Sequence, residues 1–271
     1  MTIFLCLANL IGLCQSSVRQ IQLINFDLQS SAIIKDDGST LSTTSYSSPN
    51  YWFPVKVPCT VLTGLVANKV YPDPYVGMNN MRIPDASDSF NHQYHLEQYS
   101  YLPNEPNPWK KPYWYRTTFS VPGSDNGKLF QLILKGINYR ADVWLNGKQV
   151  ADSSQMAGMF AEYSFNVSGI IKGGQENALA VKIYPLDFPG LPAHPQLTAL
   201  GDFYANGGAN GDIGKNITML CSAGGTGYLK YMIETSVFGN LFICACRGRS
   251  SYNSLTWSRI CQICLIRVRQ S

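Results

Sequence analysis

Four stretches of the chain alternate apolar and polar residues with a period of two, and this alternation limits the possible folds more than any other feature. Successive side chains of a β-strand point to opposite faces, so each stretch is expected to turn one face toward a core. The positions that share a face are Tyr113, Tyr115, Thr117, Phe119 and Val121, then Phe130, Leu132 and Leu134, then Ala141, Val143 and Leu145, and finally Leu179, Val181 and Ile183. The chain is therefore predicted to consist mainly of β-strands.

The segments between these stretches support the same fold class. Asn146-Gly147 predicts a type I′ hairpin, because both of its positions must adopt positive φ. Two earlier strands are predicted at residues 21–34 and 51–57. One short helix is expected after a Thr60 cap, with its end at Asn68. Short strands joined by turns, with a single short helix, predict an all-β, jelly-roll-like antiparallel β-sandwich.

Trp144 lies on the strand face opposite Val143 and Leu145. An indole ring is too large and apolar to remain bare on a monomer, so we expect another segment to cover it. Residues 71–112 form a long irregular segment with seven prolines, as is typical of functional or flexible loops. We expect this segment, or a further domain, to cover Trp144.

Composition and charge exclude several classes of protein. The chain is 45% hydrophobic, 12% aromatic and only 14% charged, which is unlike a disordered or coiled-coil protein. Of the net charge of +4, residues 225–271 contribute +5, so the first 224 residues carry −1. We therefore expect no nucleic-acid partner and no acidic membrane partner. No run of 18 apolar residues occurs, so no membrane-spanning helix is predicted.

The start of the chain suggests secretion. Residues 1–18 are uncharged and include an apolar stretch of signal-peptide length, although they lack a basic beginning. The triplets Asn166-Val167-Ser168 and Asn216-Ile217-Thr218 are compatible with a secreted or lumenal location. The alternative is a cytoplasmic protein with a wrongly assigned start or a buried first strand.

Cysteine and histidine positions predict neither a disulfide framework nor a metal site. Only Cys59 and Cys221 lie between the clusters at the two ends of the chain, and a single bond between them stays open. His92 and His95 have a metal-like spacing near Glu97, but no third ligand is evident, so a surface loop is the better interpretation. The four cysteines of residues 244–264 do not match a standard zinc finger. We expect no metal and no cofactor.

Several motifs resemble a known family. The motifs are Tyr113-Trp114-Tyr115-Arg116-Thr117-Thr118-Phe119, the stretch from Leu134 to Gly147 with Asp142-Val143-Trp144-Leu145-Asn146-Gly147, Gly158-Met159-Phe160, and Asn177-Ala178-Leu179-Ala180-Val181. Together they resemble the N-terminal, galactose-binding-like sugar-binding domain of glycoside hydrolase family 2. The motifs Val57-Pro58-Cys59-Thr60-Val61-Leu62, Tyr71-Pro72-Asp73-Pro74, Gly77-Met78-Asn79-Asn80 and Asp212-Ile213-Gly214-Lys215-Asn216 resemble the subgroup of exo-β-glucosaminidases and mannosylglycoprotein endo-β-mannosidases.

The resemblance covers residues 26–224 and implies a domain plan and an activity. It implies a sandwich over residues 19–224, and a parent enzyme that adds immunoglobulin-like domains and a TIM barrel. Such an enzyme would hydrolyse β-linked glucosaminides or mannosides by double displacement with retention. Residues 225–271 show no similarity, so we expect an unrelated tail that need not be ordered and adds no strand, in a truncated or mis-spliced product. The alternatives are a free-standing carbohydrate-binding protein and a nonfunctional fragment.

The candidate site residues follow from this resemblance. The family's catalytic glutamates lie on the barrel, and the Asn104-Glu105 pair sits in a proline-rich loop without a partner glutamate, so we expect no catalytic residue in this chain. Asp212, Asn206 and Asn210 are candidates for binding sugar hydroxyls, with a solvated turn as the alternative. Trp109 is a candidate for stacking on a pyranose ring, with core packing as the alternative.

Overall fold

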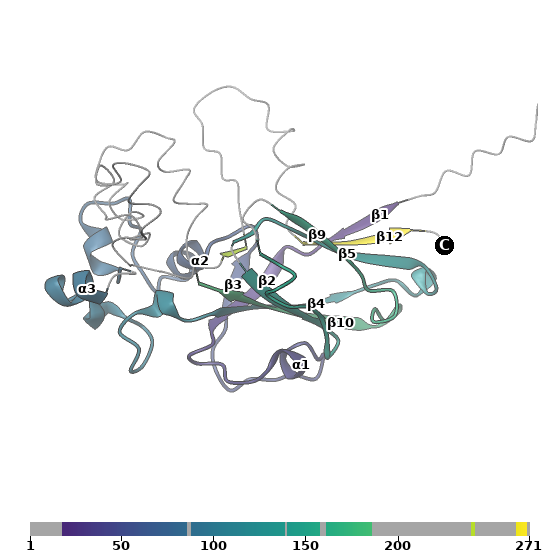
Figure 1. Ribbon diagram of the computed structural model, residues 1–271, viewed down its shortest axis with the longest axis horizontal. Helices are drawn as coiled ribbons and strands as arrows, with labels where there is room; N and C mark the ends of the chain where they lie inside the picture. Colours follow the sequence, from purple (N-terminus) through teal and green to yellow (C-terminus); the bar gives the residue numbers. More distant parts are fainter. Residues whose placement is uncertain are drawn as a thin grey trace, which may run out of the picture.

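The computed structural model describes residues 18–85, 88–138, 140–157, 161–185, 240–241 and 264–269. Two antiparallel sheets form a sandwich (Figure 1). The six-stranded sheet has the order β3 (Phe53–Lys56), β2 (Asn25–Ser30), β4 (Tyr113–Ser120), β10 (Glu176–Tyr184), β7 (Arg140–Leu145) and β8 (Lys148–Ala151). The four-stranded sheet has the order β1 (Arg19–Gln22), β12 (Cys264–Arg269), β5 (Leu129–Lys135) and β9 (Glu162–Asn166). A short pair joins β6 (Ile137–Asn138) to β11 (Asn240–Leu241). The predicted all-β sandwich is confirmed.

The predicted strand faces are also confirmed. β10 pairs with β4 from Glu176 to Ile183 and with β7 from Leu179 to Tyr184. The positions predicted to share a face in each of these strands and in β5 are buried, and all of them except Thr117 belong to one common core. At the β7–β8 hairpin, Asn146 has φ 49° and Gly147 has φ 82°, as the type I′ turn requires.

The predicted helix is present, and two further short helices were not foreseen. The predicted one is α2 (Val61–Ala67), which begins after Thr60, where the Thr60 and Thr63 side chains form a capping box, and ends at Asn68. The additional helices are α1 (Gly38–Leu41) and α3 (Asp88–Tyr94), and the 3₁₀ turns are η1 (Asn79–Arg82), η2 (Leu96–Tyr99), η3 (Pro108–Lys110) and η4 (Gly123–Asp125). Helices of one or two turns are too short to produce a visible period in the sequence.

The first predicted strand is divided between the two sheets. β1 belongs to the four-stranded sheet and β2 to the six-stranded sheet, so a single strand over residues 21–34 is wrong. Leu23 and Ile24 make the crossing. The Leu23 amide donates to the Cys264 carbonyl at 3.0 Å, and the Val57 amide donates to the Ile24 carbonyl at 2.8 Å. The crossing therefore ties the two layers together.

The expectation that residues 225–271 add no strand is wrong, because β11 pairs with β6 there and β12 adds a longer strand. This strand pairs with β5 over all six of its residues and with β1 over four. Cys264, Ile266 and Val268 are at most 2% exposed and belong to the common core. These residues alternate as those of the other predicted strands do. The stretch is short, however, and it lies in the basic, cysteine-containing end of the chain. The boundary after residue 224 stays a prediction, because residues 186–239 and 242–263 lie outside the described part.

Trp144 is half-buried, but a different segment covers it from the one expected. Its ring packs against Trp114 at 5.5 Å between ring centroids. It also lies beneath Gly38, the first residue of α1, where a Cβ atom would come within 2.1 Å of Trp144 Cδ2. The cover is therefore the segment that carries α1, not residues 71–112. The absence of a side chain at residue 38 allows the backbone to approach the indole.

This close approach predicts the effect of one added methyl group. Gly38→Ala places a carbon atom in steric overlap with the Trp144 ring, so α1 or the indole must move. We expect this movement to lower the free energy of unfolding by about 1–3 kcal/mol. Gly169→Ala is the matched control, because a Cβ atom there meets no heavy atom within 4 Å. Urea unfolding of both variants is the measurement. Equal stability of the two would contradict this packing of Trp144.

Candidate functional site

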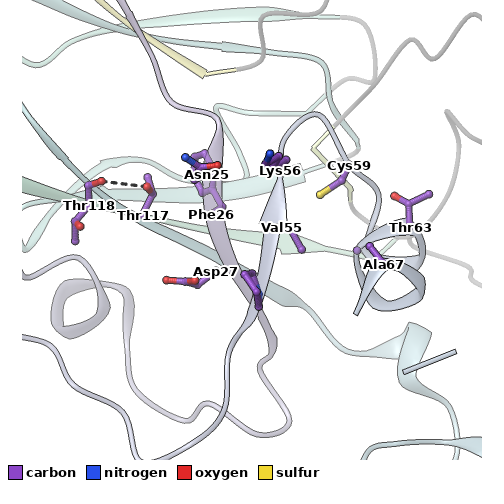
Figure 2. A pocket seen from close by; sticks show the side chains of 12 residues that line it. Asn25, Phe26, Asp27, Val55, Lys56, Cys59, Thr63, Ala67, Thr117 and Thr118 are labelled. Carbon is purple, nitrogen blue, oxygen red and sulfur yellow. Dashed lines mark hydrogen bonds between the residues drawn. The ribbon is translucent and has the colours of Figure 1, made fainter. Parts of the chain in front are cut away.

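A cavity of about 640 Å³ opens where β2, β3, β4 and α2 meet (Figure 2). We name it the β2–β4 groove. Its lining consists of Asn25, Phe26, Asp27, Pro54, Val55, Lys56, Cys59, Thr63, Gly64, Ala67, Thr117 and Thr118. A cavity of this volume is within the range of small-molecule sites in proteins.

The groove exists because two strands separate. β2 and β4 pair from Asp27–Arg116 to Ser30–Tyr113. Beyond Asp27, no ladder joins β2 to β4 among the described residues. Asn25 and Phe26 pair only with β3, on the far edge of β2, and the corresponding part of β4 pairs only with β10, on its own far edge. This split follows from the crossing of the chain toward β1. The groove therefore enters the sheet at the point where the β2 ladder leaves β4.

Helix α2 forms another wall of the groove, and a glycine sets its distance from the sheet. A Cβ atom at Gly64 would lie 2.9 Å from Leu28 Cδ2 and 3.0 Å from Val55 Cγ1. The helix can therefore rest directly on the strands only without a side chain at this position. This close packing leaves Thr63 and Ala67 at the exposed side of the helix, where both line the groove.

The groove combines polar groups with an apolar floor. Asn25, Lys56, Thr63 and Thr118 are exposed, and they supply amide, ammonium and hydroxyl groups. Figure 2 shows them on β2, β3, α2 and β4 around the opening. Buried Phe26 and Val55 form part of the floor. Such a set can donate to and accept from a neutral polyol while contacting its C–H groups.

Asp27 is the one carboxylate among the described residues that line the groove. Burial raises the pKa of its carboxyl above the ordinary value of 3.8, and the charge of Arg116 opposes this rise. Arg116 lies opposite Asp27 in the β2–β4 ladder. Its guanidinium donates to the Leu41 carbonyl at 2.9 Å and the Thr43 carbonyl at 3.0 Å, and it lies 5.3 Å from the Tyr46 ring centroid. These contacts fix the cation beside Asp27.

Cys59 does not supply a nucleophile to the groove. Burial raises the pKa of its thiol to about 12 despite the opposing effect of a Tyr115 hydrogen bond. The thiol therefore stays protonated at neutral pH, and the thiolate is the reactive form. Cys59 and Cys264 are both free among the described residues. Cys221 lies outside them, so the Cys59–Cys221 bond stays untested.

The structure places the sequence-predicted site residues apart from this groove or does not describe them. Trp109 is 1% exposed, packs against Tyr71 at 5.9 Å between ring centroids, and donates from Nε1 to the Pro84 carbonyl at 2.6 Å. This packing favours the alternative that Trp109 belongs to the core, because no ring face is free for a sugar. Asp212, Asn206 and Asn210 lie outside the described residues, so their role stays a prediction.

The other chemical candidates, Glu105 and the region of His92 and Glu97, also lie apart from the β2–β4 groove. Glu105 forms an ion pair with Lys111 at 3.0 Å. A cavity of about 200 Å³ lies near His92 and Glu97, and its lining also includes Asp88, which pairs with Lys110. In the part of the chain that the structure describes, no group of three His, Cys, Asp or Glu residues could hold a metal ion. No helix in this part is long and apolar enough to cross a bilayer.

Sequence reasoning missed the groove because its residues come from four separate elements. The Thr60 cap located α2, and the period of two located β4, yet neither signal shows where β2 and β4 separate. Asn25 and Asp27, which flank Phe26 on a predicted strand, were the available polar signal.

The pKa of Asp27 predicts how stability changes with pH. A carboxyl whose pKa is raised on folding contributes stability that is complete below its unfolded pKa and is lost as pH rises through the folded pKa. Asp27→Asn cannot lose that stability, so the natural protein should become less stable relative to this variant as pH rises from about 3 to 7.

Asp37 supplies a control of opposite sign. Hydrogen bonds from Thr40 and Ser39 lower the pKa of Asp37, so its contribution is present above the unfolded pKa and is lost as pH falls. Relative to Asp37→Asn, the natural protein should therefore gain stability as pH rises. Urea unfolding across this pH range measures both differences. The same sign for both variants would contradict the burial assigned to Asp27.

Comparisons with known proteins show which family the sandwich is similar to. Residues 100–193 match the family described as "Glycosyl hydrolase 2 galactose-binding domain-like". The chain is 31% identical to an exo-beta-D-glucosaminidase of Amycolatopsis orientalis over 160 residues. This aligned region is 59% of this chain and 13% of that protein. It is 34% identical over 140 residues to a mannosylglycoprotein endo-beta-mannosidase of Lilium longiflorum, covering 51% of this chain and 12% of that protein. The chain thus spans a small part of the length of either relative.

A solved structure shows the same relationship. The crystal structure of the Amycolatopsis orientalis exo-chitosanase CsxA superposes with a TM-score of 0.50 at 28% identity, over 63% of this chain and 17% of that chain. The matched family, the similar sequences and the common sandwich agree with one another. Residues 100–193, with the sandwich that the chain shares with these relatives, therefore match the galactose-binding-like N-terminal domain of glycosyl hydrolase family 2.

Proposed function

We propose that this domain is the carbohydrate-binding module of a retaining β-glycosidase that acts on β-linked glucosaminides or mannosides. The observation that carries the proposal is the similarity of this sandwich to an exo-beta-D-glucosaminidase and to an endo-beta-mannosidase. Because the chain spans a small part of each relative, the activity of a complete enzyme is part of the proposal. Immunoglobulin-like and TIM-barrel domains would be its partners in such an enzyme.

The groove supports a binding role more than a hydrolytic one. Retaining hydrolysis needs two carboxyl groups about 5–5.5 Å apart, one as acid/base and one as nucleophile. The described lining of the groove contains the single carboxylate Asp27. Glu105, in the sequence-predicted Asn-Glu pair, is engaged by Lys111. In this proposal the catalytic pair belongs to the barrel, and the groove holds saccharide.

Each polar group of the groove has a role in this proposal. The Asp27 carboxylate accepts from a pair of sugar hydroxyls, and the Lys56 ammonium donates to a third. The Thr118 hydroxyl both donates and accepts. The C–H face of the ring rests on Pro54 and Ala67, which are exposed at the rim. Charge-assisted hydrogen bonds to Asp27 supply much of the selectivity for saccharides that carry this pair of hydroxyls.

Titration calorimetry with oligosaccharides of β-1,4-linked glucosamine and of β-1,4-linked mannose tests binding. One of the two series should bind, and Asp27→Asn should weaken that binding at least about tenfold, because a hydrogen bond to a charged group contributes about 1.5–3 kcal/mol. Asp152→Asn is the matched control, since this exposed carboxylate lies in the turn after β8 and does not line the groove. No binding by either series, or equal binding by both variants, would contradict the assignment.

The same samples test the separation of binding from hydrolysis. The chain is expected to release no aryl group from aryl β-glucosaminides or β-mannosides. Turnover that disappears in Glu105→Gln would show that the loop at residues 104–105 is catalytic and would overturn this part of the proposal.

A further inference from the structure

β9 forms one edge of the four-stranded sheet. Its strand partner among the described residues is β5, which it pairs from Gln131–Asn166 to Lys135–Glu162. Tyr163 and Phe165 stack in parallel on its half-buried face, with 6.5 Å between ring centroids and 4° between ring planes. Both rings pack against the common core, so the feature that could align with another chain is the β9 backbone, which has no second strand partner among the described residues.

The last residue of this edge strand begins a glycosylation triplet. Asn166 is exposed, whereas Val167 is 1% exposed and anchors the turn that follows. The Asn166 Oδ1 atom accepts from the Ser168 amide at 3.0 Å and from the Ser168 hydroxyl at 2.7 Å. Both of these hydrogen bonds use the oxygen of the Asn166 side chain. Its Nδ2 amide has no hydrogen-bond partner among the residues that the structure describes.

The turn after Asn166 is fixed from the neighbouring strand. The Phe130 amide, at the start of β5, donates to the Ser168 hydroxyl oxygen at 2.8 Å. The Ile170 and Ile171 amides donate to the Val167 carbonyl at 2.9 and 3.0 Å. The triplet therefore sits in a surface turn that directs the chain away from the sheet edge. Surface turns are where a bulky attached glycan is accommodated without disturbing a core.

We propose that Asn166 carries an N-linked glycan that shields the β9 edge, which pairs only with β5 in the part of the chain that the structure describes. The inference rests on passage of the chain through a secretory compartment, which the uncharged residues 1–18 predict. The donor is a polyprenyl-diphosphate-linked oligosaccharide. A bond forms between Asn166 Nδ2 and the anomeric carbon of the first sugar, and the bond from that carbon to the diphosphate oxygen breaks. The diphosphate leaves with the electron pair, the amide loses a proton to a base, and no group is oxidised or reduced.

The position of the glycan explains how it would protect the sheet. Asn166, Ser164 and Glu162 lie on the exposed face of β9. The Asn166 side chain stands on the sheet face and not in the pairing direction, so a glycan there shields the edge only through its bulk at the end of the strand. The Lys135–Glu162 ion pair, at 3.0 Å, marks the other end of the row with charge. Charged residues and bulky surface groups are both means of preventing edge pairing.

The test uses the full chain, expressed behind a cleavable secretion signal in eukaryotic cells. Digestion with an amidase that removes N-glycans and converts the acceptor Asn to Asp, followed by peptide mass spectrometry, locates the glycan. We expect a glycan at Asn166 in the natural sequence and in Asn216→Gln, which removes the second triplet. Asn166→Gln should lose it. Ser168→Thr should keep it, because Thr preserves both the triplet and the hydroxyl bonded to Phe130.

Two outcomes would overturn the proposal. One is a secreted, folded chain whose Asn166 is unmodified, and the other is a glycan found at Asn216 alone. A size-exclusion series tests the shielding role. The natural protein, trimmed by an endoglycosidase that leaves a single sugar on Asn166 and so keeps its hydrogen bonds to Ser168, should associate at lower concentration than the fully glycosylated protein, with the same urea unfolding midpoint. Equal association of the two forms would contradict protection of the β9 edge.

Discussion

The pairing of β10 with β4 on one side and β7 on the other is the interaction on which the rest of the structure depends. It fixes which face of each strand meets the core: Tyr115, Val143 and Val181 are directly aligned and buried. A slip of one residue in either ladder would exchange this apolar face for the face that carries Trp144. The four-stranded sheet then packs on this face, with β12 between β1 and β5. Our central claim is that these two layers form one cooperative sandwich.

The candidate site follows from the same constraint. β2 pairs with β4 only as far as Asp27, because the chain must cross at Leu23 and Ile24 to reach β1 in the other layer. The separation leaves a groove at the sheet, and Gly64 lets α2 form its wall. The half-buried carboxylate of Asp27 beside Arg116 is thus a result of topology. The same crossing joins the layers and leaves room for a ligand.

The sequence predicted the features of the fold that depend on residues close together in the chain. The period of two in β4, β5, β7 and β10, the Asn146-Gly147 turn and the Thr60–Asn68 helix limits depend on neighbouring residues, and all are confirmed. The cover on Trp144 and the groove depend on which distant segments meet, and no local pattern encodes that. β12 lies between these cases, because its alternation is regular but only six residues long. The sequence indicates Trp109 and three residues at 206–212 as the site, so it does not predict the groove on β2 and α2.

Native-state hydrogen exchange tests the claim of one cooperative sandwich most directly. The amides of Ile266 and Val268 in β12 should exchange with the same opening free energy as those of Leu179 and Val181 in β10, to within about 1 kcal/mol, because one global unfolding event exposes both strands. Exchange of the β12 amides several kcal/mol below those of β10, by local opening, would contradict the claim. It would show instead that β12 docks on a sandwich that is already stable without it.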